Sequence, residues 1–255
     1  MIYEIKDTNK ISPLFGHWER NPYLVMPAGN HGENICKRPH RPYCGYAVIG
    51  IHLFRRRPCP ELIAYRPPHC TQNFMIAVPQ NKLWENMLTQ FYGKKAKIIF
   101  SLRNKKREPP IFNKHHLEKI VASLPKQYTL SMIDSHFYKL CKSEAWSKDL
   151  VSQFSTYEKY RRLGIGVVIS KDGLIISGAS SYSRYQNGIE IEIDTRKEYR
   201  RNGFACICAA KLILECLKRN LYPSWDAHNK ASAALAEKLG YHYSHAYTAL
   251  EIWDY

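Results

Sequence analysis

No apolar run in this sequence approaches the roughly 18 residues that a membrane-spanning helix needs. The N-terminal segment MIYEIKDTNKISPLF contains early acidic residues and no clean apolar stretch, unlike a secretory signal peptide. Glycine (13 residues) and proline (14 residues) are near their average frequencies in a chain of 255, which excludes a collagen-like or globally disordered protein. We therefore expect a folded cytoplasmic protein without a membrane span.

The sequence also lacks the Cys-x2-Cys spacing of common zinc sites, although it has eight cysteines. Three of these cysteines fall in a predicted helix, where small buried thiols are common. Prolines interrupt the other cysteine-rich segment, so we predict no metal site. The residues considered as zinc ligands are Cys36, His40, Cys44, Cys59, His69 and Cys70.

Acidic residues are scarce in the first part of the chain. Residues 1–110 hold 18 Lys or Arg against 7 acids, and residues 111–255 hold 20 against 15, within a formal net charge of +16. Such an excess suits an acidic partner such as nucleic acid, but a solvated basic face explains it more simply. The basic runs 55–57 and 105–107 could contact phosphates, yet no base-stacking motif accompanies them, so we do not predict nucleic-acid recognition.

A polar segment closed by two prolines, NKKREPP at 104–110, is the candidate linker. We predict an N-terminal α/β region at 1–110, of unassigned role, and a second domain at 111–255. No internal repeat at a fixed period is visible. Hydrophobic periodicity predicts strands at 46–54, 74–78, 96–102, 128–133, 165–170, 174–183, 189–195 and 221–227, two more near 241–253, and helices at 82–92, 115–123, 135–141, 148–160, 203–220 and 230–239.

The most informative segment is a turn between strand 189–195 and helix 203–220. Its sequence is Arg200-Arg201-Asn202-Gly203-Phe204-Ala205. A helix N-terminus presents unpaired N–H groups and the positive end of the helix dipole, and Gly203 removes the Cβ that would block a phosphate. The arrangement suits a pyrophosphate. The alternative is a plain strand-to-helix turn with two solvated arginines.

Strand 189–195 alternates isoleucine with Glu190, Glu192 and Asp194, so the three acids share one face. An amine nucleophile arrives protonated, and a carboxylate whose pKa is raised by burial or by a like charge can take the proton. We predict Glu192, then Glu190, as the catalytic base. The alternatives are a solvated acidic face paired with nearby basic residues, and binding of a cationic substrate without base chemistry.

These features resemble the GNAT superfamily of acyl-CoA N-acyltransferases over residues 115–255. Two motifs carry the resemblance: Arg200-x-x-Gly203-x-Ala205, and the block from Asn229 to Leu239-Gly240-Tyr241. The chain is similar to a bacterial branch of uncharacterised acetyltransferases in the stretches DLVSQF (149–154), GASSY (178–182) and YPSWDA (222–227). The resemblance implies an α/β (α+β) fold, with a mixed, mostly antiparallel sheet flanked by helices.

The resemblance also implies acetyl-CoA as co-substrate and a small-molecule or peptide amine as acceptor. The pantetheine arm would lie between the splayed strands 189–195 and 221–227. Asn229 begins a helix as a cap and would reach the coenzyme, with Ser232 one helical turn further on. The implied coenzyme contacts are the backbone of Ile193, Asp194 and Thr195, the amides of Arg201, Asn202, Gly203, Phe204 and Ala205, the charge of Arg200, and the side chains of Asn229 and Ser232.

One position departs from the family pattern. Many members carry a tyrosine that protonates the leaving thiolate, and that position is Ala236 here. Tyr241, Tyr243, another phenol or water could serve instead, or the thiolate could leave unaided, since a thiol has a pKa near about 8.5. A non-catalytic alternative also stays open: a coenzyme-binding module whose basic N-terminal region docks nucleic acid or an acidic protein. The sequence does not fix the oligomeric state.

Overall fold

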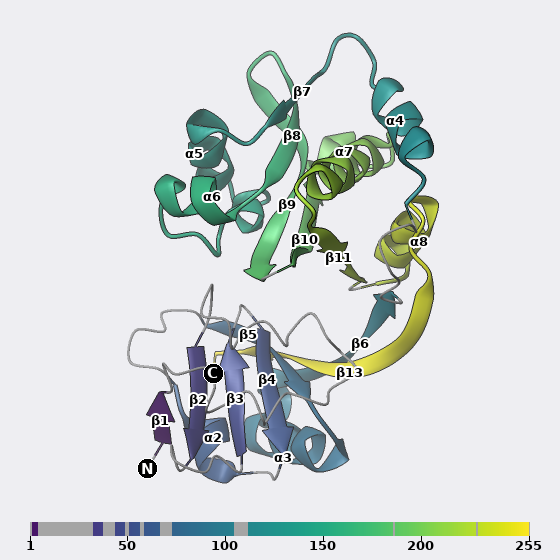
Figure 1. The fold of residues 1–255 in the computed structure, drawn as a ribbon. Coiled ribbons are helices and arrows are strands. Elements are labelled where there is room, and N and C mark those ends of the chain that lie inside the picture. The colour runs from purple at the N-terminus through teal and green to yellow at the C-terminus, as the bar shows by residue number, and fades with distance from the viewer. Residues whose placement is uncertain are drawn as a thin grey trace. The chain divides into compact units, whose positions relative to one another are not determined.

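The chain divides into two compact units (Figure 1). The first unit comprises Met1–Ser101 with Ala246–Tyr255, and the second comprises Leu102–His245. The predicted division after residue 110 stays a prediction. The computed structural model describes residues 2–4, 33–37, 44–48, 51–56, 59–66, 73–104, 112–185, 187–227 and 229–254. Within those ranges, no helix is both long and apolar enough to cross a membrane.

The first unit is built on a mixed sheet with strand order β1-β2-β3-β4-β5-β13-β6. Strands β1 to β4 pair antiparallel in sequence order, β4 pairs parallel with β5, and β13 pairs antiparallel with β5. The elements are β1 (Ile2–Glu4), β2 (Glu33–Lys37), β3 (Cys44–Val48), β4 (Ile51–Arg56), α2 (Pro60–Ala64), β5 (Phe74–Pro79), α3 (Lys82–Tyr92), η2 (Gly93–Lys95), β6 (Ala96–Asn104) and β13 (Tyr243–Trp253).

The core of the first unit forms because α3 has one apolar side. Trp84 and Leu88, one helical turn apart, are fully buried, and Trp84 packs on Phe54 of β4 with ring centroids 5.0 Å apart. The helix begins after Asn81, whose side chain accepts a hydrogen bond from the backbone N–H of Trp84. The predicted helix at 82–92 is therefore confirmed.

The predicted single strand at 46–54 is wrong. The segment forms β3 and β4, which pair antiparallel with Tyr46 opposite Phe54 and Val48 opposite His52. A continuous apolar run is compatible with one buried strand or with two strands that face each other across a turn. Residues 49 and 50, between the two strands, lie outside the described residues.

The second unit contains a five-stranded sheet with order β11-β10-β9-β8-β7. Its strands pair antiparallel except β10 and β11, which are parallel. The elements are α4 (Lys114–Ala122), β7 (Thr129–Met132), α5 (Ser135–Ser143), η4 (Lys148–Leu150), α6 (Tyr157–Leu163), β8 (Gly166–Lys171), β9 (Leu174–Tyr185), β10 (Gly188–Thr195), η5 (Lys197–Tyr199), α7 (Phe204–Lys218), β11 (Tyr222–Ser224), β12 (Asp226–Ala227) and α8 (Lys230–Lys238).

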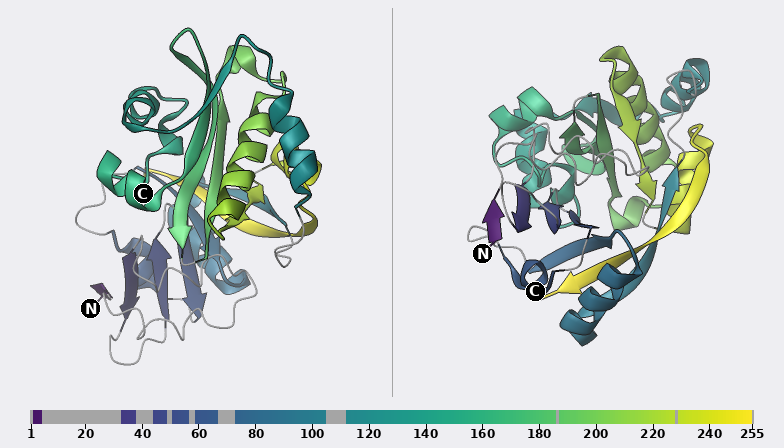
Figure 2. Two further views of the ribbon diagram at one scale, coloured as in Figure 1. Left: turned by 45° about the horizontal axis from the view of Figure 1, so that its top comes forward. Right: turned by 60° about the horizontal axis from the view of Figure 1, so that its bottom comes forward.

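Helices cover both faces of this sheet. Helix α7 packs on β8, β9 and β10, with α4 beside it, while α5, η4 and α6 lie on the opposite side of the sheet (Figures 1 and 2). Cys208, Leu212 and Cys216 of α7 are fully buried against the first face. Tyr138 and Tyr160 join the cluster on the opposite face. This mixed, mostly antiparallel sheet with flanking helices confirms the predicted fold class.

Three secondary-structure predictions for this part of the chain are wrong in detail. The predicted helix 148–160 is interrupted: η4 ends at Leu150, and α6 begins only after Thr156, whose hydroxyl accepts a hydrogen bond from Lys159 N–H. The predicted strand 221–227 is divided at Trp225 into β11, which pairs with β10, and β12, which pairs with the end of β6. The two strands expected near 241–253 are the single strand β13.

The two units share an order of strands that the sequence does not reveal. Each has four antiparallel strands in succession, followed by a helix and a fifth strand parallel to the fourth. In the first unit the helix is α2 between β4 and β5, and in the second it is α7 between β10 and β11. The chain therefore repeats one topology without a visible sequence repeat.

Candidate functional site

The turn before α7 has the backbone geometry of an anion-binding loop. Gly203 is the N-cap residue with a left-handed φ of +83°, and Arg201 also has a positive φ of 67°. Among the described residues, and apart from Gly203, its two chain neighbours and the backbone of α7, no atom lies within 4 Å of the position that a Cβ on Gly203 would take. Within residues 187–227, no hydrogen bond is made by the backbone N–H groups from Arg201 to Cys206. These groups are therefore available to a ligand.

Side-chain hydrogen bonds to backbone carbonyl oxygens stabilise the turn. Arg200 Nε donates to the carbonyl oxygen of Thr195 at 3.1 Å, and Asn202 Nδ2 donates to the carbonyl oxygens of Tyr199 and Arg200. Phe204 is only 5% exposed and packs on the ring of Tyr128. Asn202 and Phe204 are therefore positioned to offer their backbone amides to a ligand, while their side chains hold the loop.

Strands β10 and β11 separate beside this turn. They pair in parallel only from Gly188 opposite Tyr222 to Glu190 opposite Ser224, whereas β10 continues to Thr195. The other edge of β10 stays paired with β9 throughout, up to Thr195 opposite Ser177. Among the described strands, none pairs with the edge of β10 from Ile191 onward on the β11 side. This segment includes the predicted contacts Ile193, Asp194 and Thr195.

The acids of β10 occupy the face opposite its isoleucines. Ile189 is fully buried, and Ile191 and Ile193 pack against the cores beneath α7. Glu192 lies opposite Ser180 of β9, and Asp194 lies opposite Gly178, so these pairs share the other face. The predicted alternation of core and acidic residues along the strand is observed.

Burial and like charge raise the proton affinity of two of these acids. The pKa of Glu192 is raised to about 8, first by desolvation and then by the charges of Asp194 and Asp149. The pKa of Asp194 is raised to about 6 by desolvation and by Asp149, while Arg200 lowers it. A carboxyl with a pKa near 8 is well matched to a proton transfer near neutral pH.

Glu190 lies in a different environment from Glu192. It is 7% exposed and sits where β10 is paired on both edges, opposite Ser183 of β9 and Ser224 of β11. Glu192 lies two residues further, where β11 has already diverged. The geometry therefore favours Glu192 over Glu190 for contact with a substrate.

Glu192 has two further neighbours, Asp149 and Tyr182, and the first of them was missed from the sequence. Asp149 lies on η4, an element that contacts both β9 and β10, and its charge reaches Glu192 and Asp194. Tyr182 is the extra residue of a bulge in β9, between Ser183 opposite Glu190 and Ser181 opposite Ile191. Burial, with the charge of Glu192, raises the pKa of its phenol. Tertiary packing brings Asp149 to the site, and no local sequence signal marks it.

Two polar side chains, Asn229 and Ser232, make hydrogen bonds at the N-terminus of α8. Asn229 caps the helix, since its Oδ1 accepts the backbone N–H of Ser232 at 2.9 Å. The hydroxyl of Ser232 accepts a hydrogen bond of 3.0 Å from Trp225 Nε1, so it is tied to the segment between β11 and β12. Ala236, in the position that often holds the family tyrosine, is fully buried in the core beneath α7.

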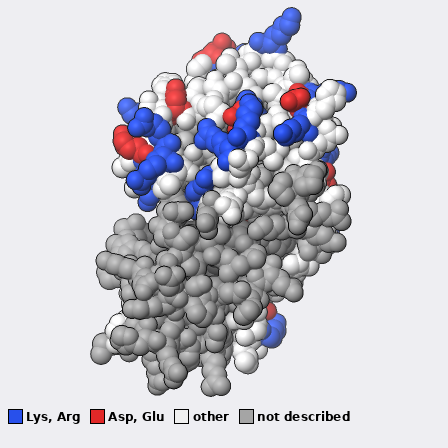
Figure 3. Space-filling model, viewed as in Figure 1, with Lys and Arg blue, Asp and Glu red and all other residues white. Residues whose placement is uncertain are grey.

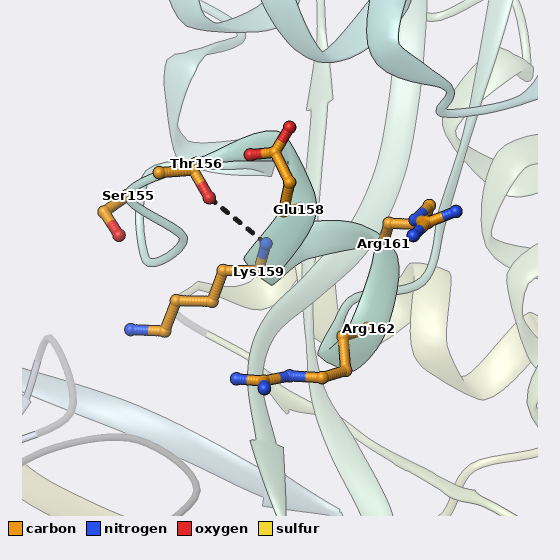
Figure 4. Close-up of a pocket in the computed structure, with 6 residues that line it drawn as sticks. All are labelled: Ser155, Thr156, Glu158, Lys159, Arg161 and Arg162. Carbon is orange, nitrogen blue, oxygen red and sulfur yellow. Dashed lines mark hydrogen bonds between the residues drawn. The ribbon is translucent and has the colours of Figure 1, made fainter.

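A separate cavity lies on α6. It has a volume of about 780 Å³. Figure 4 shows the side chains around it and the hydrogen bond from Lys159 N–H to Thr156. None of its lining residues belongs to β10 or to the turn at Gly203, so the cavity is distinct from the acidic face. The lining residues are Ser155, Thr156, Glu158, Lys159, Arg161 and Arg162.

The residues considered for metal binding and phosphate contact are only partly described. His40, His69, Cys70 and the run 105–107 lie outside the described residues. In the ranges that the structure covers, no group of three His, Cys, Asp or Glu side chains could hold a metal ion. On the face drawn in Figure 3, the Lys and Arg side chains of the second unit are interspersed with acidic ones.

A mixed sheet flanked by helices, with two strands that diverge beside the turn at Gly203, is the fold of an acyltransferase of the GNAT type. Sequence comparison gives the family: the GNAT acetyltransferase profile matches residues 12–250. The chain therefore belongs to the GNAT acetyltransferase family, which confirms the resemblance and gives the general activity, N-acetyl transfer.

Individual relatives agree with this assignment. A GCN5-related N-acetyltransferase-like protein from Streptococcus suis 89/1591 is 37% identical, with a TM-score of 0.88 over 97% of this chain and 98% of that one. The uncharacterized N-acetyltransferase YdfB from Bacillus subtilis (strain 168) is 33% identical over 132 residues, 48% of each protein, so the match spans about half of that relative.

A more distant structure shares the fold across both units. A tandem GNAT protein from the clavulanic acid biosynthesis pathway has a TM-score of 0.57 and 8% identity, over 100% of this chain and 99% of that one. At this identity the likeness concerns the fold alone. It covers the whole chain, including the first unit with its own order of four antiparallel strands and one parallel strand.

Proposed function

We propose that this chain transfers an acetyl group from acetyl-CoA to the nitrogen of a primary amine by direct attack in a ternary complex. The observation that carries the proposal is the row of unengaged amides from Arg201 to Cys206 around the left-handed Gly203. Such a row at the start of a 15-residue helix suits a pyrophosphate, and the side chains of Arg200 and Arg201 add positive charge there.

The remaining coenzyme contacts follow from the diverging strands. The edge of β10 at Ile193, Asp194 and Thr195 could pair with the amide groups of the pantetheine arm as a strand would. Asn229 and Ser232 stand at the start of α8, which follows the diverging β11 and β12. Because Asn229 Oδ1 and the Ser232 hydroxyl already accept hydrogen bonds within the protein, we expect them to act on the coenzyme through the helix start that they stabilise and through their remaining donors.

Glu192 is the proposed base. The acceptor ammonium gives a proton to the Glu192 carboxylate, and its nitrogen then attacks the thioester carbonyl carbon. The C–N bond forms, the C–S bond breaks, and the thiolate leaves with the electron pair. The second proton that the nitrogen loses on becoming an amide passes to the departing thiolate or to water. Because a thiol has a pKa near about 8.5, the thiolate can leave without a dedicated acid. The held geometry of the two substrates would supply much of the acceleration.

Calorimetry with acetyl-CoA tests the coenzyme site. Gly203→Glu places a carboxylate where the pyrophosphate would lie, so we expect binding to weaken by at least about tenfold from charge repulsion and lost approach. Gly173→Glu is the matched control: Gly173 also has a positive φ, of 78°, and open space around its Cβ position, but it lies in the β8–β9 turn. Equal binding by both variants and wild type would remove the pyrophosphate assignment.

The base is tested by Glu192→Gln in a panel of primary amines. We expect kcat to fall by about 10²–10⁴-fold while the affinity for acetyl-CoA is unchanged. If Glu192→Gln had the same pH–rate profile as wild type, Glu192 would not be the base. No observation on the described residues favours the alternative of a non-catalytic coenzyme-binding module. A cytoplasmic location and the absence of a nucleic-acid partner stay predictions.

A further inference from the structure

Three carboxylates from two separate elements meet on the exposed side of β10. Glu192 and Asp194 come from the strand, and Asp149 comes from η4, on the face opposite α7. Asp149 is exposed, whereas the two strand acids are partly buried. The charge of Asp149 acts on both strand acids and on the phenol of Tyr182.

Gly178 of β9, which has no side chain, leaves the space that lets η4 bring Asp149 to this position. Gly178 lies directly opposite Asp194, and a Cβ on Gly178 would lie 2.6 Å from Cδ1 of Leu150. Leu150 is fully buried, so it fills the space over Gly178. Because Asp149 immediately precedes Leu150, packing of η4 on Gly178 carries Asp149 alongside the acids of β10.

The start of η4 is also fixed. Ser147, which precedes it, is fully buried and its hydroxyl donates to the carbonyl oxygen of Cys141 at 3.1 Å. The backbone N–H of Leu150 donates to the carbonyl oxygen of Ser147, and that of Val151 to Lys148. Asp149 is therefore an exposed side chain on a rigidly packed turn, which is the placement expected of a group that acts by its charge.

The charges around Glu192 are mostly negative. Asp194 and Glu190 on the same strand and Asp149 on η4 all disfavour its ionised form, and the neighbouring group on β9 is the phenol of Tyr182. Arg200, in the turn before α7, has the opposite effect on Asp194, because its positive charge lowers the pKa of that carboxyl. A cation that enters this side of β10 would relieve the repulsion among the carboxylates.

We propose that Asp149 is a positioning residue of the acceptor site, which holds negative charge beside Glu192 and so strengthens this base and draws the acceptor ammonium toward it. The inference rests on the proposed function, in which Glu192 takes the proton of the ammonium. Asp149 itself forms and breaks no covalent bond. The packing of Leu150 over Gly178, which places Asp149 beside β10, supports the proposal independently of any assignment for the coenzyme.

The test is Asp149→Asn, measured by ¹³C NMR titration of the Glu192 carboxyl in the ligand-free protein, with Glu192→Gln to assign the signal. We expect the Glu192 midpoint to fall by about half to one pH unit, as expected when one nearby like charge is removed. With an amine substrate, the acid limb of kcat/KM should move in the same direction, and KM for the amine should rise more than KM for acetyl-CoA.

Asp172→Asn is the matched control, because Asp172 is also exposed in the second unit but lies in the β8–β9 turn. It should leave the Glu192 midpoint unchanged. Gly178→Ala tests the packing: the added methyl group displaces Leu150, so the midpoint should fall in this variant too, with little additional shift in the double variant with Asp149→Asn.

The outcomes distinguish a failure of the role proposed for Asp149 from a failure of Glu192 as the base. A Glu192 midpoint that is the same in wild type and Asp149→Asn would overturn the positioning role and leave the proposed function standing. Loss of the acid limb in Asp149→Asn but its retention in Glu192→Gln would instead contradict Glu192 as the base. An equal shift in Asp172→Asn would reduce the effect to net charge and would also overturn the proposal.

Discussion

The hydroxyl of Tyr241 donates a hydrogen bond of 2.6 Å to the carbonyl oxygen of Pro223 in the interior of the second unit. Tyr241 is 3% exposed, and burial raises the pKa of its phenol well above the usual value. Its proton is held by the backbone of β11 inside a core that also contains Ala236. Tyr241 is thus a structural residue and a poor candidate for the acid that protonates a leaving thiolate.

Tyr241→Phe should therefore lower stability and leave the chemistry intact. Loss of the hydroxyl leaves the buried Pro223 carbonyl oxygen without this donor, which costs about 1–3 kcal/mol in the free energy of unfolding. Urea denaturation measures this loss, and kcat at saturating substrate should stay within about twofold of wild type. A large fall in kcat with unchanged stability would instead identify Tyr241 as the general acid.

Glu192→Gln should change how stability depends on pH. The folded-state pKa of Glu192 is raised to about 8, from the ordinary glutamate value of 4.5, so the folded protein holds this proton more tightly than the unfolded chain. The stabilisation is complete below pH 4.5 and is lost as the pH rises through 8. At pH 8 and above, the glutamine variant should be more stable than wild type by on the order of 4 kcal/mol.

Urea denaturation at pH 5, 7 and 8.5 checks this prediction. Glu118→Gln, which alters an exposed carboxyl of α4, is the control and should follow the wild-type pH dependence. If the stability of Glu192→Gln had the same pH dependence as wild type, Glu192 would not be a desolvated carboxyl.

Arg200→Gln should raise the pKa of Asp194 above about 6, because the guanidinium of Arg200 lowers it in the wild-type protein. The variant also removes the Nε donor to the carbonyl oxygen of Thr195, at the end of β10. NMR titration of the Asp194 carboxyl without ligand measures the shift. Arg201→Gln, at the neighbouring exposed arginine, should leave the Asp194 midpoint in place; an equal shift in both variants would show a general loss of positive charge.

Ser232→Ala should loosen the corner between β12 and α8. The serine hydroxyl accepts from Trp225 Nε1, so its removal should cost about 1 kcal/mol in the free energy of unfolding. Ser232→Thr keeps an acceptor and should recover most of the loss. Tryptophan fluorescence during denaturation measures both variants, and identical midpoints for wild type and alanine variant would contradict a stabilising role for this bond.

The parts of the molecule that depend on local pattern were predictable. The spacing of Trp84 and Leu88 gave α3, and alternation along 189–195 placed isoleucines in the core and acids on the other face of β10. The turn at Gly203 was predictable because a left-handed residue before a helix favours glycine. These features need only the period of a helix or strand and the allowed backbone angles.

The parts that depend on distant partners were not predictable from one sequence. The run 148–160 has the apolar spacing of a helix, yet Leu150 is drawn to the space over Gly178 and Thr156 starts a new helix. Trp225 divides 221–227 because the residues on its two sides pair with different strands. Asp149 reaches Glu192 for the same kind of reason, and such pairings are decided by tertiary packing.

The place of β13 in the first unit has a consequence for synthesis of the chain. This strand lies between β5 and β6 in the sheet order, although residues 246–253 follow β6 by the whole length of the second unit. While the ribosome makes the intervening residues, β5 and β6 are already synthesised but the strand that pairs between them is not. The sheet of the first unit is therefore complete only after residues 246–253 have been made, and maturation of the two units is coupled in time.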